Sequence, residues 1–293
     1  MDIIRIPKIN DEPCDFQQLI SIWNHYHDKK DIEINFSDCK FIRQNGVAFL
    51  GGLITRLQKN ADHLSIRWET LDQAVYANLV QNGFVSAMGG DGEPWEGNSI
   101  PYRRDTEIKS DSFEQYLQDY WLKREWIHIS PDLSDFIISN VLELYMNAFE
   151  HSGSPIGVFS CGQHYPSCNE LILTIIDFGI GIPGSVRGYY VGECHNNDVS
   201  DERALEMAFE SGFSSNPESY PRGLGLNLLK EFVLKNNGTL DVYTNKAHAL
   251  IRNGCESYEK WSPSFDGTAI NIRFVCNEKL YVLGGEDCGD MFF

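Results

Sequence analysis

The chain has 293 residues, of which 42% are hydrophobic, enough to form one large domain or two smaller ones. Its 24 basic and 42 acidic residues give a formal net charge of −18, which argues against binding nucleic acid or an anionic membrane surface. No apolar run is long enough to cross a bilayer, and the first residues are too polar for a signal peptide. We therefore expect a cytoplasmic protein whose eight scattered cysteines are mostly free thiols.

The first third of the chain predicts a small α/β domain. Apolar and polar residues alternate over 32–36 and 64–68, a pattern typical of half-buried strands. Apolar residues recur at helical spacing over 47–57 and 71–80, and Asn82-Gly83 supplies a helix stop. The order strand, helix, strand, helix indicates a sheet covered by helices.

A domain boundary is expected where the composition changes. Glycine, proline and polar residues over 89–101 are typical of turns and linkers. Aromatic and apolar residues from Phe113 to Trp121 then recur at helical spacing. We predict three parts: a domain over 1–98, a linker with a connecting helix over 99–130, and a second domain over 131–293.

The second domain is expected to begin with a helix that carries polar residues along one edge. Ser130 is a good N-cap and Gly153 a good stop, so the helix should run to about His151. Glu143, Asn147 and His151 are four apart and share one face of such a helix. A carboxylate can accept a proton from water and an amide oxygen can ligate Mg²⁺, although an ordinary amphipathic helix would show the same pattern.

A second polar group follows a predicted strand. Residues 157–161 and 171–176 predict two strands, and the second runs directly into Asp177-Phe-Gly179-Ile-Gly181. The glycines allow the backbone to turn and to approach a ligand closely. A buried carboxylate here needs a hydrogen-bond donor, and the amine of a purine is one candidate, whereas a plain turn is the alternative.

The region after this motif has few regular features. Residues 184–222 contain several glycines and one helical stretch, over 200–209, a pattern typical of a functional lid or of a disordered segment. A helix then opens with glycines, which expose backbone N–H groups that can bind an anion. The residues at this helix opening are Arg222, Gly223, Leu224, Gly225 and Leu226. Strands are predicted over 239–244 and 268–275, the second beginning at Gly267-Thr268, and residues 245–266 between them are expected to form an insertion.

Taken in order, these motifs closely resemble the GHKL ATPases, the superfamily of DNA gyrase, heat-shock chaperone ATPases, histidine kinases and mismatch-repair ATPases. The order is Glu-x-x-x-Asn-Ala-x-x-His, Asp-x-Gly-x-Gly, a lid, Gly-x-Gly-Leu on a helix, and Gly-Thr before a strand. The resemblance covers about residues 107–278. It implies a Bergerat-type α/β sandwich with a mixed sheet on one side and helices on the other, with ATP and Mg²⁺ bound between the helices under the lid.

The resemblance also implies a role for each matching residue. Asn147 would ligate Mg²⁺, and Glu143 would orient or deprotonate the attacking water. Asp177 would accept the adenine amine, with Thr268 in support. The remaining positions would shape the adenine wall or face phosphate: Gly179, Gly181, Gly223, Leu224, Gly225, Leu226, Arg222 and His151.

The first domain resembles a STAS domain, the fold of anti-sigma-factor antagonists, in the order of its elements up to Asn82-Gly83-Phe84. In that family the turn before the first helix carries a phosphorylated hydroxyl residue. The corresponding run here is Arg43-Gln44-Asn45-Gly46, which has no hydroxyl. The resemblance therefore implies a docking or regulatory domain in place of a phosphorylation switch.

Three functions fit these expectations. The first is a slow Mg²⁺-dependent ATPase that switches conformation for a protein partner, which would bind through the STAS-like domain or the lid. The second is an anti-sigma-factor-like protein serine kinase, and the third is a nucleotide-binding module without turnover. The superfamily is compatible with a homodimer, and we expect no nucleic-acid or membrane partner. We also expect residues 99–293 to bind nucleotide without the first 98.

Overall fold

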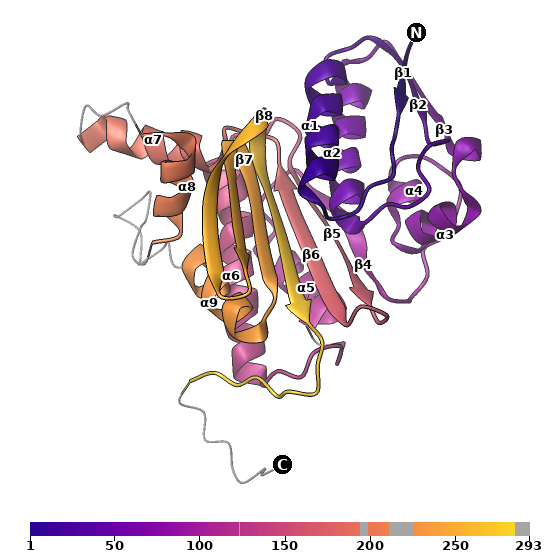
Figure 1. Ribbon diagram of the computed structural model, residues 1–293. Coiled ribbons are helices and arrows are strands. Elements are labelled where there is room, and N and C mark those ends of the chain that lie inside the picture. The colour runs from indigo at the N-terminus through magenta and orange to yellow at the C-terminus, as the bar shows by residue number, and fades with distance from the viewer. Residues whose placement is uncertain (123, 194–198, 211–224, 285–293) are drawn as a thin grey trace.

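The computed structural model describes residues 1–122, 124–193, 199–210 and 225–284 (Figure 1). Its elements, in chain order, are β1 Asp2–Arg5, α1 Pro13–Tyr26, β2 Asp31–Asn35, α2 Gln44–Asn60, β3 His63–Arg67, η1 Trp68–Thr70, α3 Gln73–Gln81, α4 Phe84–Ala87, β4 Ser99–Asp105, α5 Ser110–Leu117, η2 Gln118–Leu122, α6 Pro131–Glu150, β5 Val158–Tyr165, β6 Glu170–Asp177, α7 Gly181–Glu193, α8 Asp201–Ala208, α9 Gly225–Asn236, β7 Thr239–Arg252 and β8 Cys255–Val275. None of these helices is both long and apolar enough to span a bilayer.

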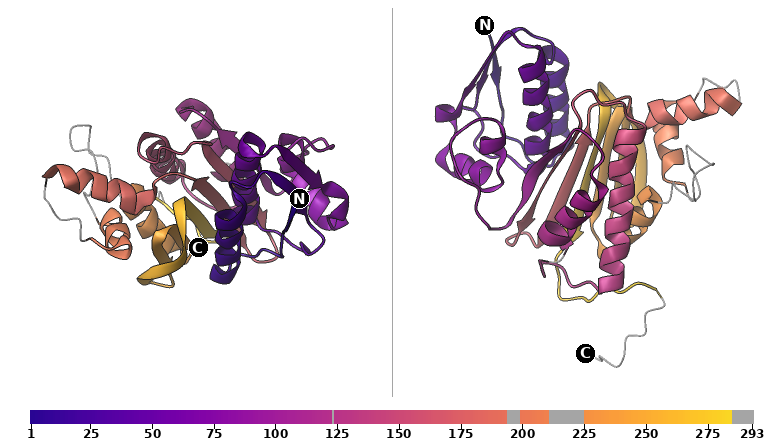
Figure 2. Two further views of the ribbon diagram at one scale, coloured as in Figure 1. Left: turned by 90° about the horizontal axis from the view of Figure 1, so that it is seen from above. Right: turned by 180° about the vertical axis from the view of Figure 1, so that it is seen from behind.

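The structure is mixed α/β and contains two sheets, one parallel with three strands and one antiparallel with five. Helices α1 and α2 lie between the two sheets, and α5, α6 and α9 lie on the far side of the five-stranded sheet (Figures 1 and 2). We refer to residues 1–98 as the N-terminal unit and to residues 99–284 as the C-terminal unit. The five-stranded sheet is therefore covered on both faces.

In the N-terminal unit the strand order is β1-β2-β3. The predicted strands and helices are confirmed as β2, β3, α2 and α3, and Gly83 takes a φ of 81° directly after the C-cap of α3. The sequence analysis missed β1 and α1. The first has only four residues, one of them buried. The second does carry a helical apolar pattern, because its buried side chains Phe16, Leu19, Ile20 and Trp23 recur at the spacing of one helix face.

The five-stranded sheet has the order β4-β5-β6-β8-β7. The predicted strands are confirmed, but every pairing is antiparallel, so the mixed sheet that the resemblance implied is wrong for this chain. Residues 99–105, expected as linker, form the edge strand β4. Pro101 lies in this strand, and an edge strand tolerates a proline because one side of its backbone needs no partner.

Side chains of the five-stranded sheet alternate between two cores. In β6, Leu173 and Ile175 face α5, α6 and α9, whereas Ile176 faces the N-terminal unit. The core on the side of Ile176 runs without a break from the parallel sheet through α1 and α2 to the antiparallel sheet. The two units therefore share a hydrophobic core.

Helix α6 forms as the sequence predicts. The Ser130 side chain accepts a hydrogen bond from the backbone N–H of Leu133 at 3.2 Å, Pro131 occupies the first helical position, and His151 is the C-cap. Gly153 follows with a φ of 60°. The apolar side of the helix, which includes Val141, is buried against the sheet.

Two regions differ from their predicted form. The first part of the expected lid is helical, because α7 continues to Glu193 and its Pro183 lies in the first turn, where proline is tolerated. Residues 245–266, expected as an insertion, extend β7 and β8 into a long hairpin whose strands have 14 and 21 residues. In Figure 1, α7 projects away from the sheet on the side opposite the N-terminal unit.

Candidate functional site

The polar edge of α6 lies at the border between core and surface. Glu143, Asn147 and His151 are all half-buried, whereas Leu144 beside them is buried. The His151 imidazole Nε2 is 4.0 Å from a carboxylate oxygen of Glu150. Glu143 and Asn147 therefore lie one turn apart at this border of α6, and His151 lies at the C-cap of the helix.

Asp177 ends β6 and is only 3% exposed. Its Oδ1 accepts a hydrogen bond from the backbone N–H of Gly179 at 2.9 Å, and Thr268 lies opposite it in β8. Burial raises the pKa of this carboxyl to about 7, although hydrogen bonds from Gly179 and Thr268 favour the ionised form. Asp177 is therefore a buried carboxyl whose protonated and ionised forms both occur near neutral pH.

The end of α6 is joined to the turn that follows Asp177. The backbone N–H of Ile180 donates to the Ser152 carbonyl at 2.8 Å. The Ser152 hydroxyl donates to the Ala148 carbonyl and also lies within hydrogen-bond reach of Asp177. This contact brings the helix that carries Glu143 next to the strand end that carries Asp177, so the first two predicted motifs meet.

The glycines around Asp177 are required by close contacts within the protein. A Cβ on Gly179 would overlap the Ser152 carbonyl, and a Cβ on Gly181, whose φ is 74°, would overlap the Asn245 side chain. Gly267 has a φ of 145° and faces the Asp177 carbonyl oxygen. These residues allow three chain segments to meet at one point.

Thr244 is a site residue that the sequence analysis missed. Its hydroxyl donates to the Gly267 carbonyl at 2.8 Å and accepts from the Ile182 N–H at 3.0 Å, so it joins β7, β8 and α7. Its Oγ1 lies 3.4 Å from that of Thr268. The next residue, Asn245, has a buried Oδ1 without a hydrogen-bond partner among the described residues. Only the register of β7 on β8 reveals this group, because the sequence marks Thr244 merely as a strand end.

The glycine motif at α9 falls partly outside the described residues. Arg222, Gly223 and Leu224 precede the part that the structure describes, and Gly225 is the first residue of α9. Leu226 is buried in the core beneath α6. Its predicted place beside phosphate stays a prediction, as does the anion site at this helix end.

A carboxylate ties helices α7 and α8 to the sheet. Asp201, in the first turn of α8, accepts from Arg187 of α7 at 2.6 Å and from the backbone N–H of Lys246 at 2.9 Å. The Ser200 side chain caps α8 by accepting from the Arg203 N–H at 3.3 Å. Asp201 therefore joins both helices of the expected lid to β7.

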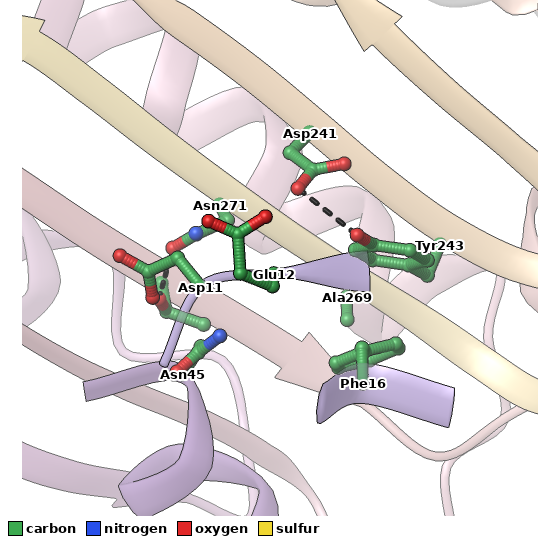
Figure 3. A pocket seen from close by; sticks show the side chains of 9 residues that line it. Asp11, Glu12, Phe16, Asn45, Asp241, Tyr243, Ala269 and Asn271 are labelled. Carbon is green, nitrogen blue, oxygen red and sulfur yellow. Dashed lines mark hydrogen bonds between the residues drawn. The ribbon is translucent and has the colours of Figure 1, made fainter. Parts of the chain in front are cut away.

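A small pocket lies between the N-terminal unit and the five-stranded sheet (Figure 3). Asp11, Glu12 and Asn45 approach it from the N-terminal unit, and Asp241 and Asn271 approach it from the sheet. Burial raises the pKa of Asp11 to about 6, despite the lowering effect of nearby arginines. The sequence analysis did not predict this pocket.

Charged and amide groups surround this pocket and join the two units. Arg43 donates to Asp11 at 2.7 Å and to Glu170 of β6 at 3.1 Å, and its guanidinium lies 4.3 Å from the centre of the Tyr165 ring. Tyr165 of β5 donates to the Gln44 side chain at 2.9 Å. The run Arg43–Gly46 therefore lies against the C-terminal unit.

No protein-family model matches the chain, and no curated protein matches it significantly. Among the described residues, no group of three His, Cys, Asp or Glu side chains is arranged to hold a metal ion. A cation that depends on further ligands from a bound molecule remains compatible with the half-buried Asn147.

Proposed function

We propose that the C-terminal unit binds Mg²⁺ and ATP as a GHKL-type domain and acts as a slow ATPase that switches conformation for a protein partner. The observation that carries this proposal is the junction of α6 with the end of β6. There a buried carboxyl, Asp177, accepts a hydrogen bond from the Gly179 N–H and lies beside the Ser152 hydroxyl, directly beyond the helix that bears Glu143 and Asn147. The order β4-β5-β6-β8-β7 with α6 and α9 on one face supports a Bergerat-type fold.

In this proposal Asp177 accepts a hydrogen bond from the adenine amine, and Thr268 supports it from β8. An ionised carboxylate is a stronger hydrogen-bond acceptor than a neutral carboxyl. An amine donor would therefore lower the pKa of Asp177 and favour its charged form. Gly179 and Gly181 allow the turn after Asp177 to lie close to the adenine and to form one wall of its site. Discrimination comes from the amine, because a guanine ring presents an oxygen at the same position and would place one acceptor against another, the ionised carboxylate.

Mg²⁺ fits the residues present. This ion prefers six oxygen ligands, keeps several waters, and usually takes only one or two protein groups beside substrate phosphates. Asn147 supplies one amide oxygen at the surface border of α6, which matches that requirement. When bound, the ion would neutralise phosphate charge, while Glu143, one helical turn away, holds the attacking water.

The remaining predicted residues would complete the phosphate side. Gly223 and Gly225 would face the phosphates with Leu224 and Leu226 beside them, and Arg222 and His151 would supply positive charge. Helices α7 and α8, held to β7 through Asp201, would form the described part of the lid. Closing or releasing this lid is how nucleotide would change a protein interface.

A protein serine kinase is the second candidate. The N-terminal unit, with its parallel sheet and α1 and α2, supports the proposed STAS-like fold. Its Arg43–Gly46 run has no hydroxyl and packs on β5 and β6, so this run is not the phosphate acceptor. If the protein is a kinase, the acceptor is another protein.

The test uses the purified full chain with Mg²⁺ and γ-labelled ATP, alone and with cell extract, and follows free phosphate and labelled protein together. Free phosphate that is absent with Glu143→Ala supports the ATPase switch. Label that moves onto a protein identifies a kinase and its substrate. Bound ATP with neither product assigns a binding module, and a chain that binds no ATP contradicts the proposal.

A further inference from the structure

Phe178 links the candidate nucleotide site to the N-terminal unit. It stands between Asp177 and Gly179, yet its side chain leaves the site and is 4% exposed in the core that the two units share. Its ring centre lies 4.4 Å from that of Trp23 on α1 and 5.5 Å from that of Phe49 on α2. A residue of the site turn is therefore packed between two helices of the other unit.

Gly52 of α2 makes room for this ring. A Cβ at position 52 would overlap the Phe178 ring, so any larger residue there would displace Phe178. Glycine in a helix interior is less favourable than alanine. Here its presence allows α2 to approach the turn closely.

The same helix is anchored at its N-terminal end by polar contacts. Arg43, just before α2, donates to Glu170 at 3.1 Å, and Gln44 donates to Asn271 of β8 at 3.4 Å. The anchor and Gly52 are about two turns apart on one rigid helix. A movement of the N-terminal unit would therefore act on Phe178.

We propose that the N-terminal unit positions the Asp177 turn by holding Phe178 between α1 and α2, so that docking of this unit and nucleotide affinity are coupled. This inference rests on the proposed function and adds a regulator to it. Because coupling is reciprocal, nucleotide should also strengthen docking. A partner that loosens the N-terminal unit would lower nucleotide affinity without touching the site.

The test compares two neighbouring glycines of α2 in the full chain. Gly52→Ala places a methyl group against Phe178, whereas Gly51→Ala places one against Tyr102 of β4, away from the Asp177 turn. Both changes add the same helix propensity and the same kind of crowding at the interface. We expect calorimetry with Mg²⁺ and ATP to show affinity lower by about tenfold or more in Gly52→Ala, and within about twofold of wild type in Gly51→Ala.

A rescue variant separates positioning from lost stability. Phe178→Leu shortens the side chain that meets position 52, so Gly52→Ala should cost no further affinity when combined with it. If wild type and both glycine variants bind with equal affinity, or if both variants lose the same affinity, Phe178 does not position the Asp177 turn. The proposed function is left intact by either result. A wild-type chain that binds no ATP overturns both the proposed function and the positioning role of Phe178.

A spectroscopic measurement covers the case in which Gly52→Ala fails to fold. Trp23 packs on Phe178, so nucleotide binding should change its fluorescence. Trp23→Phe keeps an aromatic ring in place and should remove that part of the change. The same nucleotide-induced change in wild type and Trp23→Phe contradicts the coupling.

Discussion

The Asp177 carboxyl is buried but is supplied with hydrogen-bond donors from Gly179 and Thr268. Burial raises its pKa from 3.8 to about 7, so between these values the folded protein holds a proton that the unfolded chain has lost. Asp177 therefore contributes stability to the ligand-free protein at low pH, and that contribution is lost as the pH rises through 7. An amine donor that binds the ionised form lowers the pKa of Asp177, which is the opposite of the effect of burial.

The raised pKa of Asp177 predicts that nucleotide binding depends on pH. As pH rises from about 6 to about 8, Asp177 ionises and becomes a better acceptor, so the affinity for ATP should increase. Calorimetry at several pH values on wild type and Asp177→Asn measures this, and the comparison cancels the titration of ATP itself. If both proteins show the same pH profile, Asp177 does not contact the adenine.

Glu143 has a separable role. Glu143→Ala should leave the affinity for Mg²⁺ and ATP within about threefold of wild type and lower turnover by about a hundredfold or more, as expected when a general base is removed. Glu150→Ala, on the same helix, is the matched control and should retain turnover. Binding and phosphate release measured on the same samples check this, and an equal loss of binding in Glu143→Ala and Asp177→Asn would sink the assignment of roles.

At the scale of elements, periodicity predicts those parts whose buried face follows a simple rule. The polar row on α6 and the apolar run of β6 ending at Asp177 are both visible in the sequence. Thr244 and Ser152 could not be found in this way, because their contacts depend on the register of β7 and on where α6 ends. Chains of hydrogen bonds between distant segments leave no local pattern.

The covered face of the sheet was hidden for a different reason. Asp241 and Asn271 alternate with apolar residues, and alternation of this kind is typical of a strand with one solvated face. In the structure these groups meet polar side chains of the N-terminal unit instead of water. Helix α7 was missed because its glycines and Pro183 favour irregular structure.

The tie between α7, α8 and β7 yields a prediction about the lid. Asp201→Ala removes the acceptor for both Arg187 and the Lys246 N–H, so the lid helices should loosen and release nucleotide several-fold faster. Glu202→Ala changes the next acidic residue of α8 and serves as control. Stopped-flow displacement of a fluorescent ATP analogue measures the release rate. Identical rates for both variants would show that α7 and α8 are not part of the lid.

At the scale of the whole molecule, the two units are parts of one packed structure. Phe159, Phe178 and Phe265 of the C-terminal unit lie in the same core as α1 and α2. The expectation that residues 99–293 bind nucleotide alone treats the first 98 residues as a separate body. The shared core argues against it, since removing the N-terminal unit would expose a large apolar face of the sheet.

The corresponding prediction is that a chain lacking residues 1–98 aggregates, because exposed apolar patches of this kind associate. Supplying the N-terminal unit as a separate chain during refolding should restore solubility. Size-exclusion chromatography of the fragment alone and of the mixture tests this. A monodisperse fragment that binds ATP as tightly as the full chain would show that the N-terminal unit is only an attached domain.

The purine preference of the full chain tests the proposed adenine site, and it is measured as the dissociation constants of ATP and GTP with Mg²⁺ in wild type and Asp177→Asn. At pH 8, where Asp177 is ionised, we expect wild type to bind ATP at least about tenfold more tightly than GTP, because guanine places an oxygen acceptor against the carboxylate where adenine places a donor. We also expect Asp177→Asn to weaken ATP binding and to narrow this preference. Equal binding of ATP and GTP by wild type, or an unchanged preference in Asp177→Asn, would contradict the assignment of this site to adenine.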